Sequence, residues 1–232
     1  MEFHMKINGL QKTTLLDYPG KVACTIFTAG CNFRCPFCHN ASLVTQIDPA
    51  AQYSEEELFT FLKKRRGLLD GVCITGGEPL LQPDIKEFIQ KIKALGYLVK
   101  LDTNGSFPEK LQELIEEGLV DYVAMDIKNC WEKYEQTIGV HNMAGVRTSV
   151  DFLLQGNVEY EFRTTVVAEL HTIQDIEKIA EYICTAPRYF LQNFVDSGDL
   201  IGENMHAVSP AELRQMQKAA SKYLSNVNIR GI

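Results

Sequence analysis

The sequence predicts an α/β fold in which a parallel sheet forms an open, partial TIM-type barrel. Short apolar runs alternate along the chain with segments whose apolar residues recur at helical spacing, and about six such strand–helix units are visible. This order indicates a parallel sheet, because parallel neighbours need a crossover connection and a helix usually provides it. About six units are too few for a closed barrel of eight. A doubly wound sheet is the alternative architecture.

Local signals delimit the expected elements. Ser54 and Glu57 form a capping-box pattern at the start of a helix, and Gly67 suits its end. Proline starts, glycine ends and helical spacing predict further helices from Pro83 to Gly96, from Pro108 to Gly118, over 146–154, over 173–183, and from the Ser209/Glu212 capping box onward. The apolar runs between the helices predict strands at 22–28, 72–75, 97–101, 120–127, 160–167, 189–195 and 226–232.

Composition narrows the class of protein. The 232 residues can bury a large core, and we expect one domain over 1–232, with 1–5 as a candidate non-native or disordered start because Met5 is an alternative initiator. A net charge of −7 argues against a general nucleic-acid binder. No apolar run reaches the roughly 18–20 residues that cross a bilayer, so no membrane association is expected. Seven cysteines, three of them crowded together, indicate a cofactor in a reducing, cytoplasmic environment.

The cysteine cluster carries the strongest chemical signal. Cys31, Cys35 and Cys38 form a C-x₃-C-x₂-C run. Soft thiolates select iron–sulfur clusters, zinc or copper(I). A [4Fe–4S] cube normally takes one cysteine per iron, so three cysteines leave one iron open to another ligand, as in a catalytic metal site. A Cys₃His zinc site with His39 is less suitable, because Cys38 and His39 are adjacent and cannot easily face one tetrahedral metal.

Polar residues follow the later strands in the same way. The stretch 76–79 (Gly-Gly-Glu-Pro) follows one strand, 102–105 (Asp-Thr-Asn-Gly) ends the next, and 126–128 (Asp-Ile-Lys) ends the one after; Arg163 lies in a further strand. In barrel-like α/β folds the carboxyl ends of the strands form the active-site face. Glycines allow close approach to a ligand, and a carboxylate suits an ammonium group. The sequence therefore predicts a site for a polar ligand at this edge.

Together these motifs resemble the radical S-adenosylmethionine (SAM) superfamily, in which an aromatic residue, here Phe37, commonly precedes the third cysteine. The resemblance implies one [4Fe–4S] cluster whose open iron is chelated by the amino and carboxylate groups of SAM. In that family one electron from the reduced cluster cleaves SAM to methionine and a 5′-deoxyadenosyl radical, which removes a hydrogen atom from the substrate. Its Gly-Gly-Glu motif holds the SAM amino group.

Within the superfamily, the stretches 38–40, 102–105, 125–128 and 163–167 look like those of glycyl-radical-enzyme activases. These include pyruvate formate-lyase activating enzymes and anaerobic ribonucleotide reductase activating proteins. The segments 14–21 and 189–194 resemble the longer anaerobic ribonucleoside-triphosphate reductase activating proteins. The implied substrate is a glycine Cα–H of a partner protein, a glycyl-radical enzyme, and the implied electron donor is a flavodoxin or ferredoxin.

The resemblance also implies roles for particular residues. It places SAM contacts at Phe37, His39, Gly76, Gly77, Glu78, Thr103, Lys128 and Arg163. It matches Asp102 and Asp126 to acidic positions that help hold a monovalent cation beside the SAM carboxylate.

Two departures limit this transfer. Formate-lyase activases have a histidine near the end of the last strand, where this chain has Leu-Gln-Asn-Phe at 191–194, so we expect Phe194 to stack on adenine instead. Some activases carry auxiliary clusters, but the remaining cysteines are isolated and are expected to be buried small hydrophobes: Cys24, Cys73, Cys130 and Cys184. We therefore expect a single cluster. Surface or packing roles are expected for residues without a motif, namely His4, His141, His171, His206, Trp131 and Tyr134.

Two other functions compete with the activase. A 7-carboxy-7-deazaguanine synthase is also a short radical SAM enzyme with one cluster, and it would turn over a pterin-like substrate without a protein partner. A non-catalytic iron–sulfur or zinc module would need no SAM site, so the stretch 76–78 and Arg163 argue against it.

Overall fold

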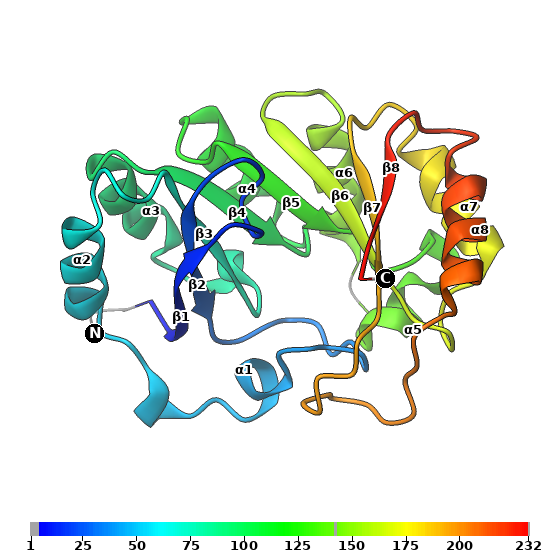
Figure 1. Cartoon of the computed structure of the whole chain (residues 1–232), viewed down its shortest axis with the longest axis horizontal. Coiled ribbons are helices and arrows are strands. Elements are labelled where there is room, and N and C mark those ends of the chain that lie inside the picture. The colour runs from blue at the N-terminus through cyan, green and yellow to red at the C-terminus, as the bar shows by residue number, and fades with distance from the viewer. Residues whose placement is uncertain (1–4, 142, 232) are drawn as a thin grey trace.

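The computed structural model describes residues 5–141 and 143–231, which contain one eight-stranded sheet in the order β1 to β8 (Figure 1). The expectations for residues 1–4, His4 among them, lie outside the described residues. The strands are β1 (Ile7–Thr14), β2 (Ala23–Thr28), β3 (Gly71–Gly76), β4 (Leu98–Thr103), β5 (Tyr122–Asp126), β6 (Glu159–Val166), β7 (Tyr189–Asn193) and β8 (Val227–Arg230).

The sheet confirms the open parallel barrel. Strands β3 to β8 each pair in parallel with the strand that precedes them in the chain, starting from β2. A doubly wound sheet reverses its strand order at a switch point, and the described sheet has no such reversal. Between its two ends the sheet curves from β1 round to β8, with α2 beyond one end and α7 and α8 beyond the other (Figure 1).

Strand β1 was not predicted. It pairs antiparallel with β2, with irregular register at two points, and most of its residues are partly buried or exposed. A strand with several polar, partly exposed residues lacks both the apolar run and the strict alternation that indicate a strand.

The helices lie close to the expected ranges. They are α1 (Ala41–Thr45), α2 (Glu55–Lys64), α3 (Ile85–Ala94), α4 (Pro108–Glu116), α5 (Tyr134–Ile138), α6 (Ala144–Leu153), α7 (Ile173–Tyr182) and α8 (Pro210–Ala220), with 3₁₀ turns at Pro49–Ala51, Pro79–Leu81 and Trp131–Lys133. The capping box of Ser54 and Glu57 is formed. The Ser209 side chain accepts from the backbone of Glu212, which gives half of the second box. The short helices α1 and α5 were not predicted.

The two faces of the sheet differ in chemistry. Apolar residues such as Val99, Leu101 and Phe162 are buried on the face that packs against the helices. Residues that alternate with them, among them Asp102 and Arg163, face the cavity described below. No helix among the described residues is long and apolar enough to span a bilayer. The assignment of 1–232 to one domain stays a prediction.

Candidate functional site

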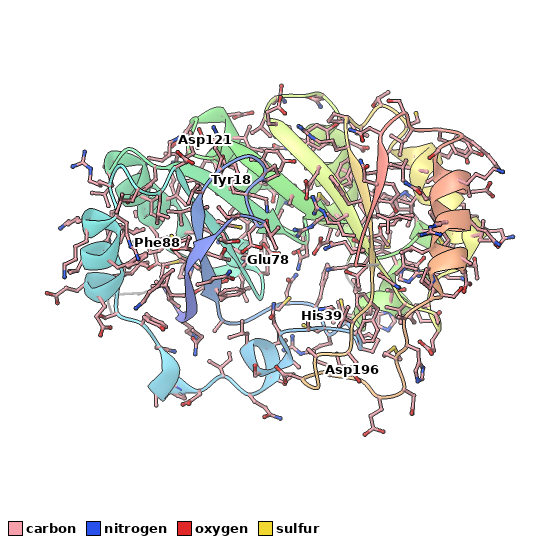
Figure 2. All side chains as sticks on the ribbon, in the orientation of Figure 1. Tyr18, His39, Glu78, Phe88, Asp121 and Asp196 are labelled. Atoms are coloured by element: carbon pink, nitrogen blue, oxygen red, sulfur yellow. The ribbon has the colours of Figure 1, made fainter. Side chains whose placement is uncertain are left out.

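A cavity of about 470 Å³ brings together every predicted site residue except Glu78 and Phe194. Those on its wall are Cys31, Cys35, Phe37, Cys38, His39, Gly76, Gly77, Asp102, Thr103, Asp126, Lys128 and Arg163. His39 lies near Asp196, where the cysteine loop meets the segment after β7, and Glu78 lies at the end of β3 (Figure 2). The carboxyl ends of the parallel strands and the cysteine loop therefore share the wall of one cavity, while the roles predicted for these residues stay predictions.

The cysteine loop is held by backbone bonds to distant segments. The N–H of Arg34 donates to the carbonyl of Ile138 at the end of α5 (2.8 Å). The N–H of Gly202, in the segment between β7 and α8, donates to the carbonyl of Pro36 (2.8 Å). The loop has no regular secondary structure of its own. These backbone hydrogen bonds therefore position its three thiols on the cavity wall.

The thiols suit a metal cluster. Cys35 is buried, while Cys31 and Cys38 are half-buried. Burial raises the pKa of Cys31 to about 11 and that of Cys35 to about 12, so both are neutral at pH 7 until a metal displaces the proton. Among the described residues, no three His, Cys, Asp or Glu side chains converge on a point where one metal ion could bind. Three thiols on one cavity wall can each bind a different iron of a [4Fe–4S] cube, with one iron left open.

Gly76 and Gly77 permit close contact between the ends of β3 and β2. Gly76 has a φ of +113°, and a Cβ there would lie 2.4 Å from the carbonyl oxygen of Thr28. A Cβ on Gly77 would lie 2.0 Å from the carbonyl oxygen of Gly30, directly before Cys31. The obstacle is backbone in both cases, so neither position tolerates a side chain without displacing the strand end or the cysteine loop.

The variant Gly77→Ala is expected to lose both stability and iron. The added methyl group pushes the Gly30 carbonyl away, at a cost of about 1–3 kcal/mol for overpacking, and moves the neighbouring Cys31. Iron content after anaerobic reconstitution and denaturant unfolding measure the two effects. Gly118→Ala is the control for the iron measurement: its φ of +67° makes alanine strained there, but a Cβ meets no neighbouring atom, so this variant is expected to lose some stability and keep its iron. Equal iron content in the two variants would contradict the expectation.

Glu78 does not line the cavity but lies buried next to it. Its side chain is fully buried. The carboxylate accepts from the Thr103 hydroxyl (2.8 Å) and the Leu80 N–H (3.0 Å) on Oε1, and from the Asn104 N–H (2.7 Å) on Oε2. Burial raises its pKa to about 7 although these three bonds oppose the shift. The structure places the carboxylate against the turn that follows β4, and the contact expected between the backbone and carboxylate of this motif and the SAM amino group stays a prediction.

Five charged side chains of alternating sign run across β4, β5 and β6. Arg163 bridges the two aspartates: Nε donates to Asp126 (2.8 Å) and Nη1 donates to Asp102 (3.1 Å). Lys100 pairs with Asp102, and Lys128 pairs with Asp126 (2.9 Å). Burial opposes ionisation of both carboxyls, but these cations outweigh it and lower the pKa of each. All four carboxylate oxygens therefore accept from a Lys or Arg, and the group as a whole carries one net positive charge.

Aromatic residues close the side of the cavity near the cysteine loop. Phe37 is buried with its ring 6.4 Å from that of His171. The buried His171 accepts from the Val167 N–H at Nδ1 (3.1 Å), so its Nε2–H donates to the Lys128 carbonyl (2.8 Å). The packing role expected for His171 is what the structure shows, and it holds the backbone of a cavity residue.

Phe194 does not lie on the cavity wall. Its side chain is 2% exposed, and its ring packs 5.4 Å from the ring of His39 in an edge-on arrangement. The structure thus places Phe194 behind His39, in contrast to the expected adenine platform. The two preceding residues, Gln192 and Asn193, line the cavity instead. Asn193 Nδ2 donates to the Val208 carbonyl (3.1 Å), and its Oδ1 is buried without a hydrogen-bond partner among the described residues.

Sequence reasoning missed several wall residues. Gln11 and Asp17 come from β1 and the loop after it, and Asn104 follows β4. The first two lay in a stretch without a strand signal. Asn104 and Asn193 were visible as polar residues at strand ends, the same signal that found Asp102 and Asp126.

The isolated residues behave mostly as expected. Cys24, Cys73 and Cys130 are buried, but Cys184 is exposed, so its prediction as a buried hydrophobe was wrong; it lies in the turn after α7. Trp131 packs against Tyr134 and Tyr182. His141 and His206 are exposed.

Comparisons with known proteins identify the family. Residues 25–183 match the family model described as the Radical SAM superfamily. A Methanocaldococcus jannaschii protein whose name places it among the glycyl-radical enzyme activating enzymes is 35% identical over 97% of this chain and 96% of its own length. The pyruvate formate-lyase-activating enzyme of Listeria monocytogenes is 27% identical over 78% of this chain and 77% of its own.

A solved structure shares the fold. Streptococcus suis SuiB bound to its precursor peptide SuiA has a TM-score of 0.71 and 15% identity, covering 89% of this chain and 48% of SuiB. The family match spans all three cysteines, and the first relative covers nearly the whole chain. This chain therefore belongs to the radical SAM superfamily and, within it, to the glycyl-radical enzyme activating enzymes.

Proposed function

We propose that the chain reductively cleaves SAM at a [4Fe–4S] cluster on Cys31, Cys35 and Cys38 and abstracts a hydrogen atom from a glycine of anaerobic ribonucleoside-triphosphate reductase. The observation that supports this most is that three thiols and a buried Asp–Arg–Lys network share the wall of one cavity. When bound and reduced, the cluster supplies the electron that cleaves SAM. A protein that only carries electrons would not need the Asp–Arg–Lys network beside its cluster.

The residues of the wall divide the work of holding SAM. Lys128 and Arg163 contribute the net positive charge that suits the SAM carboxylate. Gly77 and Thr103 offer backbone and hydroxyl groups at the strand ends. The unpartnered Oδ1 of Asn193 is an acceptor fitted to a ligand N–H or O–H group. A monovalent cation at Asp102 and Asp126 remains a prediction, as does a flavodoxin or ferredoxin as electron donor in a cytoplasmic setting.

The choice of partner rests on two segments. Segments 14–21 and 189–194 carry the resemblance to anaerobic ribonucleoside-triphosphate reductase activating proteins, and each contributes to the cavity: Asp17 from the first, Gln192 and Asn193 from the second. Both segments therefore contribute to the cavity that, under this proposal, receives the substrate glycine. Pyruvate formate-lyase is the second candidate partner, favoured by the relative from Listeria monocytogenes.

The test is a partner assay under anaerobic conditions. The reconstituted, reduced protein is mixed with SAM and either anaerobic ribonucleoside-triphosphate reductase or pyruvate formate-lyase, and the glycyl radical is detected by EPR beside 5′-deoxyadenosine. A radical on the reductase alone supports the proposal, and one on the lyase alone replaces the partner. Turnover of a pterin-like substrate without any protein would identify a deazaguanine synthase. An intact, reducible cluster that never cleaves SAM would leave a non-catalytic module.

A further inference from the structure

We propose that Asn104 donates a hydrogen bond to the sulfur of Cys31 from outside the metal's own ligand set and so raises the reduction potential of the bound cluster. This inference rests on the proposed function. Asn104 follows β4, lines the cavity and is 6% exposed. Its Nδ2 lies 3.8 Å from Cys31 Sγ. The Phe33 N–H is a second donor to the same sulfur (3.4 Å), but it belongs to the cysteine loop itself.

The orientation of the Asn104 amide is fixed by its neighbours. Its Oδ1 accepts from the backbone N–H of Ser106 (2.9 Å). A backbone N–H can only donate, so the oxygen must face Ser106 and the NH₂ group must face Cys31. A flipped amide would place two donors against each other. The direction of the bond to sulfur therefore follows from the network and not from how the amide was assigned.

A closed ring of hydrogen bonds holds this amide. Asn104 Nδ2 also donates to Asn32 Oδ1 (3.0 Å), and Asn32 Nδ2 donates to Ser106 Oγ (2.9 Å). The Ser106 hydroxyl completes the ring by donating to Asn104 Oδ1 (2.6 Å). Because Asn32 directly follows Cys31, the ring ties the cysteine loop to the turn after β4. Every donor in the ring has an acceptor, so the arrangement is self-consistent.

Glu78 extends the ring into the core. Its Oε2 accepts from the backbone N–H of Asn104 (2.7 Å), and its Oε1 accepts from the hydroxyl of Thr103 (2.8 Å). The carboxylate thereby sets the position of the turn that presents the Asn104 amide. Glu78 is a positioning residue in this scheme, because its carboxylate holds the turn that carries the Asn104 amide.

The physical consequence is a change in redox equilibrium. An N–H group that donates to a cysteine sulfur stabilises negative charge on the cluster, and the reduced state carries one more negative charge than the oxidised state. The bond therefore favours reduction. Its effect is enlarged by the low exposure of Asn104, since a hydrogen bond is electrostatically stronger in a low dielectric than in water.

The experiment is an anaerobic redox titration of the reconstituted protein without SAM, followed by EPR of the reduced cluster. Asn104→Leu removes the donor without adding charge and is expected to shift the midpoint potential to a more negative value. Asn104→Asp keeps the acceptor for the Ser106 N–H and adds a negative charge, so it is expected to shift further the same way. Ser106→Ala is the matched control, because it opens the ring and leaves the donor in place; its shift is expected to be smaller.

The outcomes separate this inference from the proposed function. A potential in Asn104→Leu equal to that of the wild type, at equal iron content, overturns the inference, as does an equally large shift in Ser106→Ala. If both Asn104 variants fail to take up iron, Asn104→Ala, which also removes the amide donor and adds no bulk or charge, is titrated instead, and a wild-type potential in that variant overturns the inference. A wild-type cluster that loads and reduces but never cleaves SAM defeats the proposed function while leaving these potentials measurable.

Discussion

Replacing Cys31, Cys35 or Cys38 by alanine, one at a time, is expected to abolish the formation of 5′-deoxyadenosine from SAM. Each thiol lies on the wall of the same cavity, and a [4Fe–4S] cube with one open iron has no spare protein ligand. Loss of a partner outside the ligand set commonly costs 10–100-fold in metal affinity or activity, so loss of a ligand is expected to cost more than about 100-fold. Product is measured by chromatography and iron by chemical analysis.

The control is Cys184→Ala. Cys184 is exposed, and it does not belong to the cavity wall. It is expected to keep the iron content and the rate of SAM cleavage of the wild type, because no described contact links it to the site. Retained cleavage in any one of the three loop variants would show that the cluster has another ligand. Lost cleavage in Cys184→Ala would show that the effect of the alanine variants is not specific to the loop.

The strands and helices could be predicted because their signals are local. The apolar periodicity of α3 and the cap of α2 by Ser54 each depend on a few residues that are close together in the sequence. The same holds for the cysteine loop, whose spacing carries the chemistry by itself. Strand β1 could not be predicted, because its pairing with β2 is what makes it a strand and most of its own residues are partly buried or exposed.

The sequence predicted which residues belong to the candidate site, but not which of them contact one another. Asp126 and Arg163 are recognisable as charged residues in strands, but their pairing depends on the register of β5 against β6, which sets them opposite one another. Glu78 shows the other limit. Its neighbours Thr103 and Asn104 are 25 and 26 residues away, so only the folded chain reveals that its carboxylate faces them and not the cavity. Residue types at strand ends identify a site, whereas register and turn geometry assign the roles.

Replacing Arg163 by leucine is expected to cost about 3 kcal/mol of unfolding free energy at pH 7, before any cofactor is added. The Arg163 side chain is 13% exposed and forms ion pairs with both Asp102 and Asp126. Its removal leaves each of these partly buried carboxylates with a single lysine as its partner. Breaking a buried pair by removing one partner typically costs about 3–5 kcal/mol, and the lower end applies because Asp126 retains 26% exposure. Denaturant unfolding of the metal-free protein measures the loss.

The pH dependence identifies the cause of that loss. Arg163 and the lysines hold the pKa of Asp102 and Asp126 below the unfolded value of about 3.9, so the pairs stabilise the folded state above that pH and lose their effect as the pH falls through the depressed pKa values. The stabilities of wild type and Arg163→Leu should therefore converge in acid. Arg163→Lys keeps the charge but cannot bridge both aspartates, so its loss of unfolding free energy is expected to be smaller than that of Arg163→Leu. Lys222→Met removes an exposed ion pair with Glu177 and should change stability far less. A difference between wild type and Arg163→Leu that stays constant into acid would assign the loss to packing and not to charge.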